Sequence, residues 1–525
     1  MTIRFDHSGV SRRVFLGTAS AVASSALLPT IAAPAATYVR YNATGARGQD
    51  MLKSYAIAIE RMMNLPPTDA RNWFRNAFIH TLDCPHMNWW FFVWHRGYLG
   101  WFEQTVREMS GNKSFAFPYW DWSEVNGPQP GYCIPKPMLD GVLTPISEPY
   151  SKYMSSFDTF YNYLNPAMET FWKSLSADQL AALNVRGMPT LDSVWTQVKG
   201  GMFQVTPNAR YLRSGNACLS EATQGEVSKE NVEDGLSAPT FDTFNSGQTK
   251  QHSQMSPSGG PLESGPHNQT HNNVGGYTLE PNSDVGVMAD NLSPIDPLFF
   301  LHHSNMDRLW DVWTRRQQFC HRPALPTGTE WTAYAREKFM FYVNPAGNPV
   351  TQTEAGSYTA MAQFGYTYEP GTGEEMTRKC PPLLTAARTR PVAATVKGGI
   401  ATLAVAPASL AAAPGHPAVA SVRVPYPANA SAPRTFAVLV NAPPGNTDTS
   451  PKSPYFAGTI GFFGFMPGMS GMSVDFEVPL TRVLKTLKAS KDKTLSIQVV
   501  PLAGKGATLQ AVRASTVEAA SVTVW

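Results

Sequence analysis

Two periodicities of apolar and polar residues divide the chain. In its first two thirds, apolar side chains recur at intervals of three and four, which is typical of amphipathic helices. One such stretch, residues 70–80, carries four apolar residues on one face: Trp73, Phe74, Ala77 and Phe78. A second begins at His95. A longer helix is predicted from Asp296, as its N-cap, and Pro297, in its first turn, to about Gln318.

After Cys380 the pattern changes to alternating apolar and polar residues between turn signals, which is typical of strands. Clear alternation covers residues 435–440, 495–500 and 521–525. Short strands in this arrangement predict a small β-sandwich. We therefore expect a mainly α domain over residues 37–380, a linker and the start of the C-terminal region over 381–420, and a β-domain over 421–525.

Composition excludes several classes of protein. The 525 residues include 42 Lys and Arg against 39 Asp and Glu, a formal charge of +3, and no basic cluster. Nucleic acid binding needs a concentrated positive surface, so we expect no nucleic acid partner. Charged residues make up only 15% of the chain and aromatic residues 11%, which indicates an aromatic-rich globular protein and not a disordered one.

The N-terminal residues have the features of an export signal. Arg12 and Arg13 precede an apolar run over residues 14–28, and residues 33–35 supply the small side chains of a cleavage site. The many Ala and Ser residues make this run too weakly apolar for a membrane span. Residues 1–36 are therefore predicted to be a twin-arginine signal that directs export to the periplasm or beyond. No later segment is predicted to cross a membrane.

Five cysteines follow in the sequence: Cys84, Cys133, Cys218, Cys320 and Cys380. In an exported protein an odd number means that at least one has a fate other than an internal disulfide. The wide spacing specifies no pairing, and no Cys-x-x-Cys metal pattern is present.

Seven of the eleven histidines fall in two groups, which are His80, His86 and His95, and then His267, His271, His302 and His303. His267 and His271 are four residues apart, so on a helix they share one face and can meet one metal ion. A zinc protease of this spacing needs glutamate where Asn268 stands, which excludes that class. Adjacent helical residues point about 100° apart. Only one of His302 and His303 can therefore face this site, and geometry does not choose between them.

Two groups of three histidines on helical frames predict a metal centre. Neutral imidazoles without a thiolate set or a ligand carboxylate suit copper better than magnesium, calcium or an iron–sulfur cluster. The remaining histidines have no partner at ligand spacing and are predicted to be surface or loop residues: His7, His252, His321 and His416.

The histidine segments resemble the type-3 copper proteins, namely tyrosinases, catechol oxidases and molluscan hemocyanins. The resemblance extends over roughly residues 50–370. Its densest part is the block 296–310, which reads Asp-Pro-Leu-Phe-Phe-Leu-His-His-Ser-Asn-Met-Asp-Arg-Leu-Trp. Shorter matches are His80, Cys84-Pro85-His86, Trp94-His95-Arg96 and His267-x-x-x-His271.

The resemblance implies a helical bundle that holds two copper ions. It assigns one ion to His80, His86 and His95 and the other to His267, His271 and His303. His302 and Asp307 are then supporting residues beside the ligands.

The resemblance gives three further residues a role. The Cys84-x-His86 spacing is similar to that of the thioether crosslink between cysteine and histidine in some relatives, which would account for the odd cysteine. Glu263 and Asn268 stand where plant relatives hold a water that deprotonates an incoming monophenol. Phenol has a pKa near 10, so a base must assist its ionisation at neutral pH.

The C-terminal segments 455–459 and 474–478 are similar to parts of the plant polyphenol oxidase domain that covers the copper site in latent enzymes. Between them lies the apolar loop 461–469, rich in Phe and Met. We expect this loop either to cover the catalytic site as a lid or to pack within its own domain.

The activity that the resemblance implies is that of an exported tyrosinase. With O2 as co-substrate, such an enzyme hydroxylates small monophenols at the ortho position and oxidises o-diphenols to o-quinones. Two alternatives remain. They are a catechol oxidase that lacks the hydroxylation step and a hemocyanin-like O2 carrier.

Overall fold

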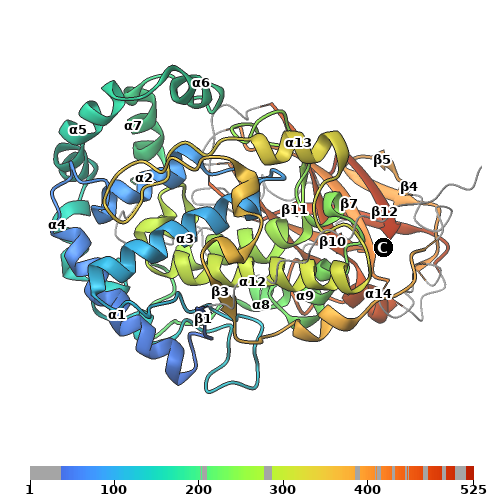
Figure 1. The fold of residues 1–525 in the computed structure, drawn as a ribbon. Coiled ribbons are helices and arrows are strands. Elements are labelled where there is room, and N and C mark those ends of the chain that lie inside the picture. Colours follow the sequence, from blue (N-terminus) through green and yellow to red (C-terminus); the bar gives the residue numbers. More distant parts are fainter. Residues whose placement is uncertain are drawn as a thin grey trace, which may run out of the picture. The chain divides into compact units, whose positions relative to one another are not determined.

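Helical and β-rich parts follow one another along the chain (Figure 1). The computed structural model describes residues 37–525 except 202, 204–209, 277–285, 385–390, 408–409, 411–415, 429–431, 444–445, 447, 465–470, 488–491 and 503–515. The signal predicted for residues 1–36 lies outside the described residues. The described residues all belong to one compact unit. Within them, no helix combines the length and apolar character needed to cross a membrane.

The helical part is a bundle around α3 and α12. Its longer helices are α1 (Ala46–Met63), α2 (Trp73–Asp83), α3 (Phe91–Ser110), α5 (Phe157–Lys173), α7 (Leu191–Gly200) and α12 (Leu298–Phe319). Its shorter helices are α4 (Glu148–Met154), α6 (Ala177–Val185), α8 (Glu221–Glu226), α9 (Lys229–Leu236), α10 (Phe241–Phe244), α11 (Asn268–Gly275) and α13 (Gly328–Arg336). Helix α3 packs against both α1 and α12.

An aromatic core holds these helices together. Eight tryptophans are among its largest fully buried side chains: Trp73, Trp89, Trp90, Trp94, Trp120, Trp122, Trp310 and Trp313. Large aromatic side chains bury much apolar surface and interlock in edge-to-face and stacked pairs. The high aromatic content of the sequence is therefore concentrated where the helices meet.

Local sequence sets the ends of the helices. Helix α2 begins later than predicted because the side chain of Asn72 accepts hydrogen bonds from the first backbone N–H groups, those of Phe74 and Arg75 (both 3.1 Å). It also continues to Asp83, so that His80 lies inside its last turn. Helix α3 begins at Phe91, one turn before His95.

Asp296 caps the start of α12, as predicted. The side chain of Asp296 accepts a hydrogen bond from the backbone N–H of Leu298 (2.9 Å), as an N-capping residue does. Pro297 directly precedes the helix, which ends at Phe319, one residue beyond the predicted Gln318.

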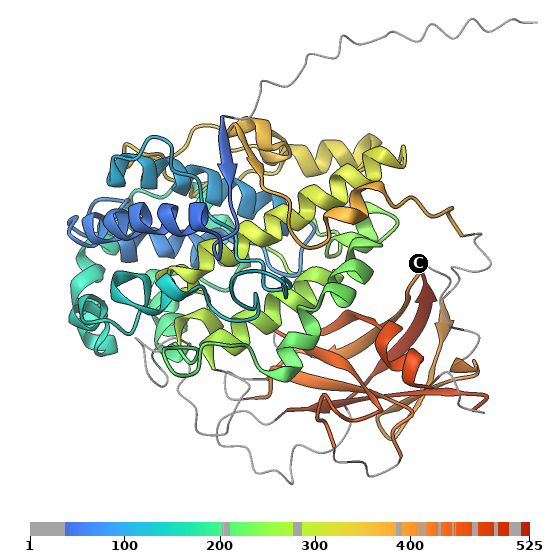
Figure 2. The same cartoon turned by 90° about the horizontal axis from the view of Figure 1, so that it is seen from below.

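The C-terminal part is a two-layer β-structure, coloured orange to red in Figure 2. One sheet has the strand order β2-β10-β7-β12-β4, with β2 (Ser258–Gly259), β10 (Ser473–Pro479), β7 (Ala418–Pro425), β12 (Ala519–Val524) and β4 (Val392–Ala393). The other has the order β5-β6-β11-β8-β9, with β5 (Thr395–Lys397), β6 (Ile400–Leu403), β11 (Leu495–Pro501), β8 (Thr435–Val440) and β9 (Phe456–Gly461). The short helix α14 (Thr481–Leu487) follows β10.

Residues from both sheets share one apolar core, as a sandwich requires. The alternating segments of the sequence all form strands, so the prediction of a mainly helical part followed by a β-sandwich is confirmed. Strand β2 comes from the helical part and pairs in parallel with β10, with Ser258 opposite Asp475. The two parts are therefore joined by a shared sheet.

Two disulfides staple the helical part. Cys133 pairs with Cys218, and Cys320 pairs with Cys380. Cys84 is left as a buried free thiol. The odd cysteine of the sequence is therefore the one that lies next to the first histidine group.

Candidate metal centre

The first histidine group comes from two helices and the segment between them. His80 lies in the last turn of α2, His95 lies in α3, and His86 lies in the connecting segment. The nitrogen and sulfur atoms of His80, Cys84, His86 and His95 that could bind a metal all lie within 4.8 Å of one another. All four side chains are buried.

The second group is held on helical turns throughout. His267 ends a single π-turn (Glu263–His267) that continues into α11 with His271, while His302 and His303 lie on α12. Isolated π-turns are frequent at functional sites because they re-aim a side chain within a helix. The potential ligand atoms of these four histidines also lie within 4.8 Å of one another.

The two groups adjoin. The rings of His95 and His303 stack with their centroids 4.0 Å apart, and those of His86 and His267 lie 6.0 Å apart. The six histidines predicted as ligands therefore line one continuous site.

Burial keeps these imidazoles neutral. It lowers the pKa of His95 and of His271 to about 3. For His80, His86, His267 and His303 burial, together with neighbouring histidines, also lowers the pKa far below its usual value. A neutral imidazole has one nitrogen lone pair free to bind a metal.

Hydrogen bonds fix which nitrogen carries that lone pair. Nδ1 of His80 donates to the carbonyl of Asn291 (2.7 Å), and Nδ1 of His271 donates to that of Met288 (2.8 Å). Nδ1 of His95 donates to the carbonyl of Phe91, one turn earlier in α3 (2.8 Å). The Nε2 atom of each ring is thus the acceptor, as is common for histidine ligands of metals.

The structure separates the adjacent histidines that the sequence could not. The indole N–H of Trp122 donates to Nδ1 of His302 (3.1 Å), so the hydrogen of that neutral ring must lie on Nε2. His302 then has no lone pair to offer a metal. Nε2 of His303, by contrast, lies 3.1 Å from Nε2 of His271.

The imidazole nitrogens of the two histidine groups fit soft or borderline metal ions. Nε2 of His80 and of His267 is buried and has no hydrogen-bond partner among the described residues. Two sets of three neutral imidazoles without a carboxylate ligand suit copper, whereas magnesium and calcium prefer oxygen.

Cys84 lies between the rings of the first group. Its Sγ is 3.3 Å from Nε2 of His95 and 3.7 Å from Nε2 of His86. Burial raises the pKa of the Cys84 thiol, which therefore remains protonated and is a poor metal ligand. The thioether predicted between Cys84 and His86 requires the proximity that this arrangement provides.

Glu263 and Asn268 flank His267 along the chain. Glu263 is buried and accepts hydrogen bonds from the backbone N–H of Met87 (2.5 Å) and from the hydroxyl of Ser246. Burial raises the pKa of Glu263 to about 8. The side-chain oxygen of Asn268 accepts from Nδ1 of His267 (2.8 Å), so Asn268 orients this ring.

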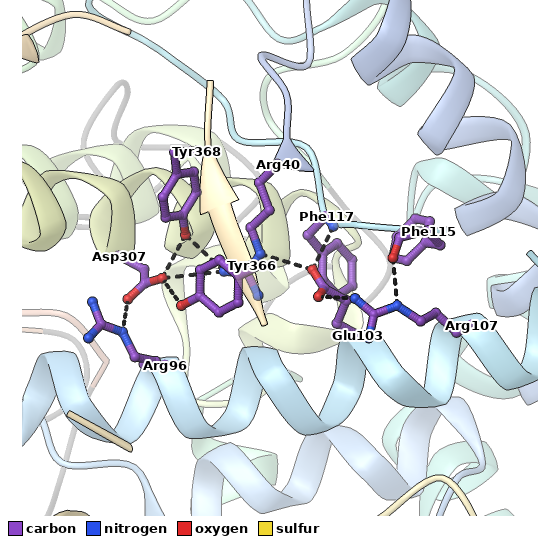
Figure 3. Close-up of polar contacts among 9 residues, drawn as sticks. All are labelled: Arg40, Arg96, Glu103, Arg107, Phe115, Phe117, Asp307, Tyr366 and Tyr368. Atoms are coloured by element: carbon purple, nitrogen blue, oxygen red, sulfur yellow. Dashed lines mark hydrogen bonds and ion pairs between the residues drawn. The ribbon is translucent and has the colours of Figure 1, made fainter. Parts of the chain in front are cut away.

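Asp307 belongs to a buried network of charges between α3, α12, β1 (Tyr38–Arg40) and β3 (Tyr366–Tyr368) (Figure 3). Its carboxylate accepts hydrogen bonds from Arg96 (2.6 Å), Arg40 (3.3 Å), Tyr368 (2.6 Å) and Tyr366. Burial alone would raise the pKa of Asp307, but the two arginines outweigh it and lower the pKa.

This network ties together the helices that carry the central histidines. Arg96 directly follows His95 in α3, and Asp307 lies one turn after His303 in α12. The ion pair between Arg96 and Asp307 therefore fixes the spacing of these two helices. Arg40 extends the network to Glu103, which also pairs with Arg107 (Figure 3).

The C-terminal part reaches the histidines through Phe463, two residues after β9. Its ring centroid lies 4.3 Å from that of His271 and 4.7 Å from that of His86, so it contacts both groups. The preceding Phe462 instead packs in the β-sandwich, 4.9 Å from Phe476. Within the loop 461–469, Phe463 therefore contacts the histidines and Phe462 packs within its own domain; residues 465–470 lie outside the described residues.

Two hydrogen bonds from α11 to the C-terminal part lie beside the ring of Phe463. The side-chain N–H of Asn268 donates to the carbonyl of Gly461 (2.7 Å), and that of Asn272 donates to the carbonyl of Phe462 (3.1 Å). In this arrangement the amide of Asn268 is shared between His267 and the C-terminal part.

The sequence predicts His252 to be a surface or loop residue; it lies in a turn between α10 and β2, but it is not at the surface. It is 2% exposed, and its two ring nitrogens lie 2.9 Å from Asp83 and 2.6 Å from Glu337. His416 is also buried and donates to the carbonyl of Trp525 (2.7 Å). Neither has a sequence signal, because its partners lie far away in the chain.

Family models match two parts of the chain. Residues 61–316 match the common central domain of tyrosinase, and residues 428–519 match the chloroplastic polyphenol oxidase C-terminal domain. A chloroplastic polyphenol oxidase of Spinacia oleracea is 26% identical over 337 residues, which cover 61% of this chain and 45% of that protein. A tyrosinase of Hahella sp. (strain CCB-MM4) is 23% identical over 355 residues, which cover 61% of this chain and 61% of that protein. The chain spans about half the length of the curated relatives it matches.

Solved structures share the fold across both parts. A latent aurone synthase (polyphenol oxidase) aligns with a TM-score of 0.57 at 18% identity, covering 94% of this chain and 91% of that chain. A latent apple tyrosinase aligns with a TM-score of 0.55 at 19% identity, covering 94% and 98%. The chain therefore belongs to the tyrosinase and polyphenol oxidase family of type-3 copper proteins, and it carries a C-terminal domain as well as the central one.

Proposed function

We propose that the protein is an exported tyrosinase that uses O2 to hydroxylate small monophenols at the ortho position and to oxidise o-diphenols to o-quinones. The observation that carries this proposal is the pairing of two sets of three neutral imidazoles in one buried site. Membership of a family of oxidoreductases that act on phenols supports the proposal.

In this proposal His80, His86 and His95 hold one copper ion, and His267, His271 and His303 hold the other. The tautomers support Nε2 as the ligand atom of His80, His95 and His271. The bond that Trp122 donates to Nδ1 of His302 supports a place for His302 beside the ligands and not among them. The copper pair would supply the site at which O2 and the phenol oxygen react.

The residues of the chain contribute orientation and proton transfer. Asn268 and the carbonyl partners hold the imidazole rings in place. A monophenol must lose its hydroxyl proton, and we assign the base to a water held by Glu263 and Asn268. Glu263→Gln should then lower the turnover of monophenol by about 10²-fold or more, as for loss of a general base, and the turnover of o-diphenol less. Equal losses with both substrates would contradict this role.

We further propose that residues 421–525, together with the strands β4, β5 and β6 of the preceding segment 381–420, form an inhibitory lid on a catalytic domain of residues 37–380. Phe463 supports this because its ring lies where an aromatic substrate would meet His86 and His271. The lid also engages the amide of Asn268, which would otherwise be free to bind the water. Opening the lid would therefore uncover the rings of His86 and His271 and, at the same time, free the amide of Asn268.

The decisive experiment is O2 consumption by the copper-loaded protein with tyrosine and then with its o-diphenol, before and after limited proteolysis between Cys380 and Ser421. Uptake with both substrates, rising after cleavage, is expected. Uptake with the diphenol alone would favour a catechol oxidase, and reversible O2 binding without turnover would favour an O2 carrier. An unchanged rate after removal of the C-terminal fragment would contradict the lid.

Adjacent phenylalanines provide a matched pair of variants for the lid. Phe463→Ala should raise the activity of the uncleaved protein because it removes the ring that covers the histidines. Phe462→Ala should instead lower the free energy of unfolding by about 3–5 kcal/mol, because Phe462 fills the sandwich core.

Two proposals concern maturation. We propose that Cys84 forms a thioether with His86, in which a C–S bond replaces the S–H bond of the thiol and a C–H bond of the ring while O2, the proposed co-substrate, takes up the two electrons and two protons. The intact mass of the copper-loaded protein should then be two hydrogens lower than its two disulfides alone explain. We also propose export by the twin-arginine signal of residues 1–36. The two disulfides support it, since such bonds persist in oxidising compartments.

A further inference from the structure

The side chain of one buried arginine has no polar partner among the described residues. Nine arginines are buried in this part of the chain, and eight of them donate to a carboxylate, an amide or a backbone carbonyl: Arg40, Arg96, Arg107, Arg186, Arg210, Arg308, Arg316 and Arg434. The ninth, Arg75, is 7% exposed, and the described residues give its guanidinium no hydrogen bond and no ion pair. The guanidinium carbon lies over the ring face of Phe171, 4.0 Å from the ring centroid.

The position of Arg75 in its helix makes this more unusual. It lies in the first turn of α2, where the aligned backbone dipoles favour negative charge and disfavour a cation. Burial lowers the pKa of Arg75 to about 10, and no nearby carboxylate opposes that effect. The side chain is still charged at neutral pH and has no counter-ion among the described residues. Its charge is balanced by the Phe171 ring, a contact of about 2 kcal/mol when desolvated, and by the solvent that reaches the exposed 7% of the residue.

Arg75 lines a cavity of about 280 Å³ between α2, α5, α6 and the segment 340–349. The remaining walls are largely apolar and include Ile79, Leu82, Phe171, Phe341 and Val343. Among the described residues that line it, Arg75 is the only Asp, Glu, Lys, Arg or His side chain. The volume of the cavity is close to the lower end of the range usual for small-molecule sites.

We propose that this cavity binds a small organic carboxylate with an apolar body, held by an ion pair with Arg75. The guanidinium fork matches a carboxylate in shape and charge, and charge-assisted bonds of this kind are among the strongest in proteins. The apolar walls of the cavity would contact the apolar body of the ligand. An inorganic anion has no such body and would leave these walls uncovered. Such a ligand would supply the counter-ion that Arg75 lacks among the described residues.

The site lies on the helix that carries a proposed copper ligand. Ile79, which lines the cavity, directly precedes His80 in α2. A bound carboxylate therefore contacts α2 from the side that carries Arg75 and Leu82. The inference does not depend on the proposed phenol chemistry, because it concerns residues outside the histidine site.

The probe is cyclohexanecarboxylate, and its uncharged amide, cyclohexanecarboxamide, is the matched control. Isothermal titration of the copper-loaded full chain should show binding of the carboxylate and at least tenfold weaker binding of the amide. Arg75→Met should weaken binding of the carboxylate by at least about tenfold. Arg71→Met is the control variant, because Arg71 is partly exposed and already paired with Asp69; it should leave the affinity unchanged.

Two further variants separate binding in this cavity from binding elsewhere on the protein. His303→Ala should retain the affinity, which distinguishes the cavity from carboxylate binding at copper. Ala167→Leu narrows the cavity, which Ala167 lines, while Arg75 stays in place, and it should also weaken binding about tenfold. Without the probe, the melting temperature of Arg75→Met should equal or exceed that of the wild type, because the variant removes a largely buried charge that has no counter-ion among the described residues. Equal binding of acid and amide, or full affinity in both Arg75→Met and Ala167→Leu, would overturn the proposal.

Discussion

The two histidine groups have the same number of candidate ligands but different supports. In the second group every histidine lies on a helical turn, and the neighbours that orient the rings are uncharged: the carbonyl of Met288, the amide of Asn268 and the indole of Trp122. In the first group His86 lies on an irregular segment between α2 and α3. This difference predicts that the first group depends more strongly on the residues around it.

Ionised side chains support the first group. Asp83, in the last turn of α2, accepts a hydrogen bond from the indole of Trp94 in α3 (2.9 Å) and lies 2.9 Å from Nε2 of His252. Nδ1 of His252 lies 2.6 Å from Glu337. A histidine between two carboxylates can donate to both only when it is protonated. Asp83 therefore joins α2 to α3 through Trp94, and the ionic chain through His252 and Glu337 holds Asp83 in place.

The first group also lies closer to solvent. Cys84 and His86 line a cavity of about 440 Å³, together with Arg186 and His252. His86 is 5% exposed, whereas His267 and His271 are fully buried. We call the second group, whose rings are oriented by uncharged neighbours, the neutral half of the site, and the first group, which is flanked by Asp83, His252 and Glu337 and borders a cavity, the ionic half.

The largest expected effect tests the neutral half. His303→Ala should lose one of two copper ions per chain and nearly all phenol oxidation, because Nε2 of His303 faces Nε2 of His271. His302→Gln should keep both ions, with copper affinity weaker by about 10–100-fold, as is usual when a residue that supports a ligand is changed. Copper content by mass spectrometry and O2 uptake measure both results. Loss of copper in His302→Gln with retention in His303→Ala would reverse the assignment.

The next effect tests the ionic half. Asp83→Asn leaves His252 with one of its two carboxylate partners, and removal of one partner from a buried charged network costs about 3–5 kcal/mol. We expect that loss in the free energy of unfolding, together with weaker copper binding at the first group only. The control is Asp50→Asn, whose exposed pair with Lys53 contributes about 0–1 kcal/mol. Equal losses at both copper sites would remove the distinction between the halves.

The sequence predicted much of this site because its information is local. The spacing of His267 and His271 on one helical face, the paired His302 and His303, and the alternating residues 435–440 depend on neighbours a few positions away. The resemblance then supplied the pairing of the groups. The choice of His303 over His302 agrees with the bond from Trp122, a contact that spans 180 positions in the chain.

The parts that the sequence could not predict all depend on distant contacts. His252 has no partner at ligand spacing, yet Asp83 and Glu337 meet it from positions 169 and 85 residues away. Phe462 and Phe463 are chemically identical and adjacent, and only the tertiary structure sends one into the sandwich and the other to the histidines. Arg75 lies one turn before Ile79 in an ordinary helical pattern, and its lack of a polar partner among the described residues is visible only once the fold is known.

The smallest expected effect is a pH dependence of the ionic half. Burial alone would lower the pKa of His252, but Asp83 and Glu337 outweigh it, so its pKa is raised above the usual value. The stabilisation is therefore fully present below the unfolded pKa of about 6.5 and is lost as pH rises through the folded pKa. His252→Gln should lose most stability at pH 5.5 and progressively less toward pH 9, at about 1.4 kcal/mol for each unit of raised pKa.

Denaturant unfolding of the wild type and of His252→Gln across this pH range measures the effect, and exposed His321 provides the control variant His321→Gln. The difference in free energy of unfolding between wild type and His252→Gln should become smaller as pH rises. The difference between wild type and His321→Gln should not change with pH. Copper at the first group should become easier to remove over the same interval, because the ionic chain positions α2 and α3, while copper at the second group should not. A difference in stability that is constant with pH would mean that His252 acts by packing alone, and the two halves of the site would then differ in geometry but not in charge.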